Sequence, residues 1–311
     1  MVLRATGLNP ATEALMQWIQ QQADDRRDDY ELARRYYGGE HDTAITDRLK
    51  KFLPPRLAFR DNFMNVVVDS LSERLKVIGF NSEDEDFAEW AWHLWQQNRM
   101  DYTQVVVHME AVMLGDSYIL CDWDQETERP RWTHQMPEMI LPHYNETNRQ
   151  IDWVSKKWIS HPHIGDEPET RLNLYYPDRV EKYRARGGVW APYQDELDEE
   201  WPVPWLDRAG APLGIPLIHF RNRPMGNDFG QSEIINVIPM QDLLNKPLID
   251  LTMILDTLAF PQRYTLNVNH NSSRLEIMPG SVAEFHSEYD GGSVGQWQAA
   301  TVDGPLKAIE S

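Results

Sequence analysis

Apolar residues recur every three or four positions through most of the first third of the chain. This spacing is typical of helices that bury one face. It begins with Leu15, Trp18 and Ile19 in a mainly acidic stretch that ends at Gly38 and Gly39, and glycine commonly follows the C-terminus of a helix. The pattern predicts one or two helices over residues 9–37 and further helices over residues 57–75, 84–99 and 102–114.

The middle third changes to short apolar runs that are separated by turn residues. Residues 117–122 precede a polar segment with Pro130, and residues 131–134 then resume the run, which is typical of a β-hairpin. Residues 194–207 are acidic and rich in proline and tryptophan, which indicates an exposed loop. The pattern predicts antiparallel strands at residues 117–122, 131–134, 139–144, 152–159, 171–176, 180–184 and 217–220.

Helical spacing returns over residues 231–260 and predicts one long helix. At 1.5 Å per residue such a helix spans about 45 Å, more than a typical globular helix needs. Asp228 or Ser232 is placed to cap its start, and Pro239 and Pro247 predict a kink or break. Strands are predicted at residues 262–268 and, more weakly, at 274–285, before the chain turns toward helix at Leu306.

Together these segments predict the fold class α+β. A helical N-terminal part precedes antiparallel β-structure, and a long helix precedes a small β-containing region. Helices and strands that follow one another in blocks, instead of alternating, are typical of this class.

The charge of the chain narrows the classes of function. The 311 residues carry a formal net charge of −19, whereas a protein that grips nucleic acid by its phosphates usually has basic patches. Two interpretations stay open: a protein unrelated to nucleic acid, or one that lets DNA pass without holding it. No apolar run approaches the length of a membrane helix, so we expect no membrane partner.

No motif for catalysis or cofactor binding stands out. A glycine-rich phosphate loop is absent from the sequence, which argues against nucleotide hydrolysis. The single cysteine, Cys121, lies in a predicted strand without a basic neighbour, as a structural thiol would. His134 and His143 occur singly in predicted strands, and no third ligand lies close to His161 and His163. We therefore expect no cofactor, no metal and no enzymatic activity.

Two other classes of function remain as alternatives. Twelve tryptophans, twelve tyrosines and 49 acidic residues are compatible with a carbohydrate-active enzyme that uses paired carboxylates and aromatic platforms. That class predicts a pocket with converging carboxylates. A non-enzymatic interaction module predicts a stable monomer with one binding patch.

Short motifs follow one another in a fixed order from about Tyr36 onwards. They occupy residues 36–41 (YYGGEH), 59–62 (FRDN), 66–69 (VVVD), 73–75 (ERL), 78–80 (IGF), 174–179 (LYYPDR), 214–218 (GIPLI), 220–223 (FRNR), 230–234 (GQSEI) and 259–263 (AFPQR). In order and spacing they resemble the signature of phage portal proteins of the siphophage type found in actinobacterial phages. The resemblance covers most of the chain.

The resemblance implies a ring of identical subunits, usually a dodecamer, at one vertex of the capsid. The ring forms the channel for DNA packaging and ejection. Residues 1–115 would form the helical part of a wing, 116–228 its β-rich part, 229–260 a stem helix, and 261–311 the clip region and the start of a second stem helix. Because portals of this family continue beyond that point, the resemblance also implies that a C-terminal part is missing.

The resemblance further implies partners, a location and site residues. The partners are other copies of the chain, the terminase large subunit, a head-completion or adaptor protein, capsid and scaffolding proteins, and double-stranded DNA that passes without sequence-specific binding. The location is the portal vertex of the virion, and the bacterial host cytoplasm during assembly. Channel-facing stem candidates are Glu233, Asp242, Lys246, Asp250 and Asp256, and clip candidates for partner contact are Gln262, Arg263 and Arg274.

Overall fold

The computed structural model describes residues 10–40, 61–124, 127–161, 167–195, 198, 200–226, 228–259, 263–266 and 293–296. The chain divides into two compact units. Unit 1 comprises Met1–His41 and Asn62–Ile238, and unit 2 comprises Asp42–Asp61 and Pro239–Ser311. The helical first third and the strands that follow it therefore fold together, and nearly all of the last helix belongs to unit 2.

The described helices of unit 1 follow the predicted helical pattern. They are α1 Pro10–Tyr37, α3 Met64–Ser72, α4 Glu85–Gln97 and α5 Met100–Leu114. Asp84 caps α4, since its carboxylate accepts the backbone N–H groups of Asp86 and Phe87 at 3.1 and 3.2 Å. Helix α3 is shorter than the predicted 57–75: a turn follows it at Glu73, and residues 57–60 lie outside the described residues.

The strands of unit 1 form two antiparallel sheets. The first has the order β2-β1-β9, with β1 Asp116–Asp124, β2 Arg129–Gln135 and β9 Leu217–Arg221. The second has the order β3-β4-β5-β6-β7, with β3 Ile140–Tyr144, β4 Ile151–Ser160, β5 Glu169–Tyr175, β6 Arg179–Arg186 and β7 Val189–Pro192, and β8 Val203–Pro204 pairs with β6. A short 3-10 helix, η1 Pro137–Met139, joins the two sheets.

The strand predictions are confirmed, with two additions. The predicted hairpin is β1–β2, in which Tyr118 lies opposite Gln135. Strand β7 is an addition, and it returns from β6 through a turn at Gly187 and Gly188. Strand β8 is the second addition, and it lies within the segment that we expected to be a loop. Its two residues form a strand only through pairing with Arg179 and Val180, which the local sequence does not indicate.

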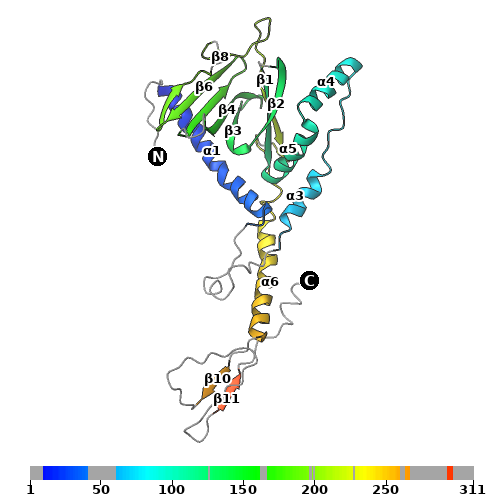
Figure 1. Ribbon diagram of the computed structural model, residues 1–311, viewed down its shortest axis with the longest axis vertical. Coiled ribbons are helices and arrows are strands. Elements are labelled where there is room, and N and C mark those ends of the chain that lie inside the picture. The colour runs from blue at the N-terminus through cyan, green and yellow to red at the C-terminus, as the bar shows by residue number, and fades with distance from the viewer. Residues whose placement is uncertain are drawn as a thin grey trace. The chain divides into compact units, whose positions relative to one another are not determined.

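Helix α1 lies across the larger sheet in Figure 1 and supplies much of its cover. Met16 and Ile19 of α1 pack with Leu172, Leu174 and Tyr183 of the sheet, and all five are buried. Burying a large apolar side chain contributes about 1.5–3 kcal/mol relative to leaving it exposed. The apolar stripe of α1 therefore fixes the helix on this face.

A second buried cluster joins the two sheets to each other. Tyr118 and Leu120 of β1 pack with Val154 and Tyr175 of the larger sheet. Helices α1, α3 and α5 share a further cluster around Met64, in which Ile234 is fully buried. Unit 1 is thus held together by buried side chains from every layer.

Unit 2 contains helix α6 Ile238–Ala259 and the strands β10 Arg263–Leu266 and β11 Ser293–Gln296, which pair antiparallel. The helix predicted from residue 231 begins seven residues later than expected. The reason is local: the Ser232 hydroxyl accepts the N–H of Ile234 at 3.1 Å, and the N–H of Glu233 donates to Val112 O at 3.0 Å. The backbone N–H of Glu233 is therefore bonded to α5, and that of Ile234 to a side chain within a turn, so neither takes part in a helix.

The two prolines of the predicted helix differ in position. Pro239 falls in the first turn of α6, where no N–H is needed, whereas Pro247 lies inside the helix. Strand β10 confirms the core of the strand predicted at residues 262–268. The weaker strand predicted at 274–285 and the helix at Leu306 lie outside the described residues.

The mixture of helices with antiparallel sheets confirms the α+β class. The division into parts at residues 115, 228 and 260 stays a prediction. Over the part of the chain that the structure describes, no helix is both long enough and apolar enough to cross a membrane.

Candidate functional site

Helix α6 carries a row of charged residues. Asp242, Lys246 and Asp250 follow one another at intervals of four and so share one side of the helix. Lys246 and Asp250 are exposed, and Asp242 is half-buried. A second exposed row is apolar, with Met240 at 58%, Leu243 at 62% and Leu244 at 45% exposure. The helix therefore offers one charged side and one apolar side.

A third side of α6 is buried although it is polar. Gln241 and Asn245 are 0% and 2% exposed. The Gln241 side-chain amide donates to the backbone oxygen of Asp61 at 2.7 Å, and the Asp61 N–H donates to Asn245 Oδ1 at 3.0 Å. Because both amides are satisfied by backbone groups, this side fixes the helix to the segment at Asp61 within unit 2.

The remaining predicted site residues are spread over the chain. Glu233 lies in the turn before α6, in unit 1, where Arg223 binds its carboxylate at 2.7 Å and Asn222 donates to it at 2.9 Å. It is therefore not on the helix for which it was proposed. Asp256 lies on α6 and Arg263 in β10, of which the backbone is described. Gln262 and Arg274 lie outside the described residues.

Asp116 is the centre of a buried polar network in unit 1. Its side chain is 0% exposed. One carboxylate oxygen accepts His219 Nε2 at 2.8 Å and the Gly230 N–H at 2.7 Å. The other accepts the Tyr30 hydroxyl at 3.1 Å and the Arg26 guanidinium. One residue at the start of β1 thus ties together α1, β9 and the segment before α6.

His219 completes this network. Its Nδ1 lies 2.6 Å from the Tyr144 hydroxyl, and its ring stacks on Tyr118 with the centroids 4.4 Å apart. Burial lowers the pKa of His219, and this outweighs the opposite effect of the Asp116 carboxylate on the pKa. The neutral imidazole can accept the Tyr144 proton at Nδ1 and donate to Asp116 from Nε2.

Glu110 of α5 is a second buried carboxylate with the same kind of surroundings. Arg34 of α1 donates to one oxygen at 2.7 Å, and His134 of β2 lies 2.6 Å from the other. Ser117 also donates to the second oxygen, at 3.2 Å. Because both oxygens are engaged, Glu110 joins helices to sheet and leaves no open carboxylate for acid–base chemistry.

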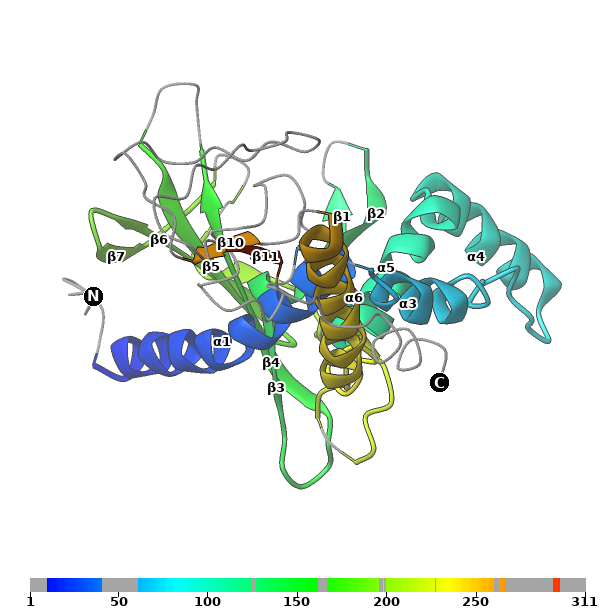
Figure 2. The ribbon, with the colours of Figure 1, turned by 90° about the horizontal axis from the view of Figure 1, so that it is seen from below.

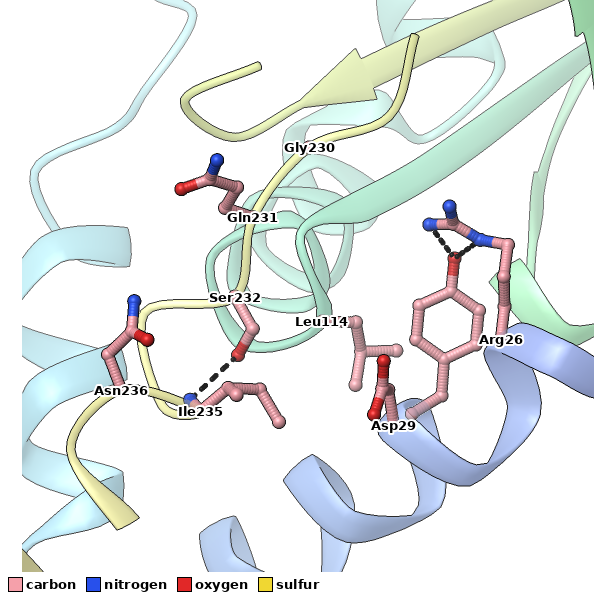
Figure 3. Close-up of a pocket in the computed structure, with 9 residues that line it drawn as sticks. Arg26, Asp29, Leu114, Gly230, Gln231, Ser232, Ile235 and Asn236 are labelled. Atoms are coloured by element: carbon pink, nitrogen blue, oxygen red, sulfur yellow. Dashed lines mark hydrogen bonds between the residues drawn. The ribbon is translucent and has the colours of Figure 1, made fainter. Parts of the chain in front are cut away.

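A pocket of about 410 Å³ lies beside the Asp116 network (Figure 3). Arg26, Asp29 and Tyr30 of α1 line one side of it, and residues around Ser232 line the other. The Ser232 hydroxyl donates to Met113 O at 2.5 Å and accepts the N–H of Ile234. A hydroxyl that donates to a backbone carbonyl lacks the adjacent base that activates a nucleophile.

Burial raises the pKa of the Cys121 thiol to about 11, so the thiolate is scarce at neutral pH. Among the residues with described side chains, no cluster of His, Cys, Asp and Glu is arranged to hold a metal ion.

Sequence reasoning missed both buried networks. His134 and His143 were treated as single polar residues, but His134 meets Glu110, and His143 stacks on Trp153 with the centroids 5.0 Å apart. The partners lie far away in sequence, so no local spacing indicates them. The available signal was Asp116 itself, because a charged residue there interrupts the apolar pattern directly after Gly115.

The family model described as "Phage portal protein, SPP1 Gp6-like" matches residues 16–281. The matched range includes α1 from Met16 onwards, both sheets of unit 1, α6 and β10. No curated protein is significantly similar in sequence to the chain. Since the family model covers well over half of the 311 residues, the chain belongs to the phage portal protein family.

Proposed function

We propose that this chain is a structural subunit of a portal ring at one vertex of a phage capsid, where the ring forms the channel for DNA packaging and ejection. The match to the portal family over residues 16–281 is the observation that carries the proposal. In this role the ring docks the terminase large subunit, a head-completion or adaptor protein, and capsid and scaffolding proteins. Assembly takes place in the host cytoplasm, and the origin in an actinobacterial siphophage stays a prediction.

Helix α6 supports the stem role. Its charged row of Asp242, Lys246 and Asp250 suits a wall that faces DNA, and Asp256 lies six residues further along the same helix. Its apolar row of Met240, Leu243 and Leu244 suits contact with a neighbouring subunit. We assign the charged row to the channel and the apolar row to the subunit contact, and Gln262, Arg263 and Arg274 to partner contact in the clip.

The charge of the chain agrees with this role. Because the chain has a formal net charge of −19, it repels DNA phosphates at long range instead of binding them. A channel through which DNA slides needs such a surface, because phosphate contacts would hold the duplex in place. Hydrolysis of ATP belongs to the terminase partner in this scheme.

The experiment is the mass of the purified chain in solution, measured by light scattering after size exclusion, with electron microscopy of the same fraction. The expected species has about twelve times the 36.4 kDa of one chain and shows a central opening. A species that stays monomeric up to high concentration, also in the presence of scaffolding protein, would contradict the proposal.

A carbohydrate-active enzyme is the alternative that the same sample tests. It requires two carboxylates that converge on an open pocket. The buried carboxylates Asp116 and Glu110 are instead engaged by arginine and histidine on both oxygens, and the buried Glu169 is engaged by Arg171 and Arg186. Turnover of a glycan by the monomeric fraction would favour the alternative.

A further inference from the structure

Helices α3, α4 and α5 form an arm at one side of unit 1, away from β6 in both views (Figures 1 and 2). Residues 73–84, which we name the link, join α3 to α4. The first exposed side of the arm, which we name the α4 face, consists of Asp86, Phe87, Glu89 and Trp90. The second, which we name the link face, consists of Arg74, Leu75, Lys76, Ile78, Tyr102 and Val105. We propose that the α4 face of one copy binds the link face of the next copy. The proposal rests on the ring of the proposed function and names the surfaces that join its subunits.

The α4 face combines exposed aromatic rings with carboxylates that are not paired. Phe87 is 53% and Trp90 55% exposed, and their ring centroids lie 5.7 Å apart. Helix α4 contains neither lysine nor arginine. The exposed carboxylates of Asp86 and Glu89 form no ion pair with any residue that the structure describes. Exposed aromatic pairs of this kind are typical of the centre of a protein interface, so this face is suited to bind another molecule.

The link face is the more apolar of the two. Leu75 is 49%, Ile78 81%, Tyr102 75% and Val105 61% exposed. No other large apolar side chain in the described part of the chain is as exposed as Ile78. Apolar side chains gathered in this way on the surface of a folded protein mark a site of contact with another molecule.

Hydrogen bonds hold the link along α5 and so bring these apolar side chains together. His108 Nδ1 lies 2.9 Å from Leu75 O, and the Val77 N–H donates to Gln104 Oε1 at 2.8 Å. The exposed side chains of the link therefore lie beside the turn of α5 that carries Val105.

The charges of the two faces differ. Arg74 and Lys76 of the link face are exposed, and neither forms an ion pair within the described residues. The exposed carboxylates of Glu73 and Asp101 border this face, so that it is close to neutral, whereas the α4 face is acidic throughout. Contact between the two faces brings Arg74 and Lys76 toward unpaired carboxylates. Contact of one α4 face with another would instead oppose like charges, so charge favours the pairing that we propose.

The link and the α4 face lie on different sides of α4. Phe80 of the link packs against Trp92 and Trp95, with ring centroids 6.1 and 5.7 Å apart. Trp90 precedes these two residues by two and by five positions, so its side chain leaves the helix on the opposite side. The α4 face is therefore directed away from the link.

The two faces also lie on different sides of α5. Tyr102 and Val105 continue a helical row with Met109 and Val112, which pack in the cluster shared with α3. Val107, which packs with α4, lies on the other side of α5. A ring closes through a heterologous contact, in which two different faces of each subunit meet. The arm fits such a contact, because one copy can use both faces at once.

Two variants that each lose one face test the contact. Phe87→Asp with Trp90→Asp disables the α4 face, and Ile78→Asp with Tyr102→Asp disables the link face. Each variant alone is expected to associate at least about tenfold more weakly than the unmodified chain, because the apolar centre of the contact is lost. An equimolar mixture of the two variants is expected to give a heterodimer and nothing larger, since one pair of intact faces remains. Sedimentation velocity measures the species.

Met225→Asp, at a side chain that is 75% exposed in a turn, is the matched control and should leave association unchanged. Circular dichroism of each variant checks that it is folded. A mixture without heterodimer would overturn the proposal, as would an unmodified chain that stays monomeric at millimolar concentration. Undiminished self-association of the variant without the α4 face would show that two link faces meet instead.

A charge exchange tests the same contact while leaving the apolar residues in place. Arg74→Glu with Lys76→Glu is expected to weaken self-association at least about tenfold, because the acidic α4 face then meets an acidic partner. Asp86→Lys with Glu89→Lys in the same chain is expected to restore it, as paired charges do in double-mutant cycles. Failure of the fourfold variant to recover would show that these positions do not meet.

The outcomes separate this proposal from the proposed function. If the unmodified chain forms a ring and the variants without one face form it equally well, the named faces are wrong and the portal role stands. If the mixture gives the heterodimer but light scattering finds open chains of the unmodified protein instead of a closed ring, the faces are right and the ring is wrong.

Discussion

At the scale of single residues, the buried carboxylates decide how the parts of unit 1 are joined. Asp116 is fully buried and accepts hydrogen bonds from Arg26, Tyr30, His219 and the Gly230 backbone. A buried charge is tolerated only when it is paired and hydrogen-bonded, because removing a partner leaves part of its desolvation free energy uncompensated. The side chains around Asp116 therefore differ strongly in how much they contribute.

Two buried tyrosines make this difference measurable. The Tyr30 hydroxyl donates to Asp116 and accepts from Arg26 Nε at 3.0 Å, whereas the Tyr118 hydroxyl has no hydrogen-bond partner within the described residues. Tyr30→Phe is expected to lower the free energy of unfolding by about 1.5–3 kcal/mol, because hydrogen bonds to charged groups are lost. Tyr118→Phe is expected to leave it unchanged or to raise it slightly. Urea unfolding of the two variants checks the order, and an equal loss in both would contradict this account of the network.

His219 predicts a dependence of stability on pH. Its pKa is lowered by burial from the ordinary value of 6.5, so the unfolded chain takes up a proton more readily than the folded chain. The stability that neutral His219 contributes is therefore complete above the ordinary pKa and is lost as the pH falls through it toward the lowered pKa of the folded state. Between about pH 7.5 and about pH 5.5, the free energy of unfolding is expected to fall more steeply in the unmodified chain than in His219→Gln. If the free energy of unfolding depends on pH in the same way in both proteins, this prediction is wrong.

At the scale of elements, the junction between α5 and β1 depends on close backbone contact. Gly115 ends α5 with φ +98°, and a Cβ there would lie 2.9 Å from the carbonyl carbon of Gly230. The Asn222 N–H donates to Gly115 O at 2.8 Å, and the Gln231 N–H donates to Asn222 O at 2.7 Å. The segment that leads to α6 therefore crosses the junction backbone to backbone.

Gly230 is the test of this crossing. A Cβ at Gly230 would overlap the carbonyl oxygen of Gly115, so Gly230→Ala must push two backbone segments apart. We expect a loss of about 3 kcal/mol in the free energy of unfolding, at the upper end of overpacking effects. Gly79→Ala is the matched control, because a Cβ there meets nothing within 4 Å, and it should change stability by no more than about 0.5 kcal/mol. Similar thermal unfolding of both variants would show that the two backbone segments can accommodate a methyl group at Gly230.

At the scale of the whole molecule, net charge bears directly on the channel role that we propose. The net charge of −19 disfavours a stable complex with a duplex. In the proposed ring, every copy would present Asp242, Lys246 and Asp250 to the channel, so that each change on this row is multiplied by the number of subunits.

The charged row of α6 therefore gives a prediction for DNA binding. Assembled protein with Asp242→Lys and Asp250→Lys is expected to retain double-stranded DNA at low salt and to release it steeply as salt rises, since binding then depends on released counterions. The unmodified protein should retain none. Glu128→Lys with Glu146→Lys, in exposed turns of unit 1, makes the same change of net charge elsewhere and serves as the control. Equal DNA binding by both double variants would contradict the assignment of this row to the channel.

How much could be predicted from the sequence differs between elements. The helices that became α1, α4 and α5 and the hairpin β1–β2 were predicted, because their apolar spacing and the glycines or caps at their ends are local signals. The start of α6 was misplaced, because Ile234 continues the helical pattern but is buried among α1, α3 and α5 instead. The assignment of Asp242, Lys246, Asp250 and Asp256 to the channel stays a prediction, and the late start of α6 separates Glu233 from that helix.

The sequence by itself determined the classes of element, the α+β class and the family, because periodicity, capping residues and motif order are encoded locally along the chain. Only the tertiary structure decided which distant side chains meet. Asp116 and His219 are 103 positions apart, and Arg34 and Glu110 are 76 apart. The physical reason is that pairing across strands and burial of charge are properties of the folded chain, and local spacing does not specify them.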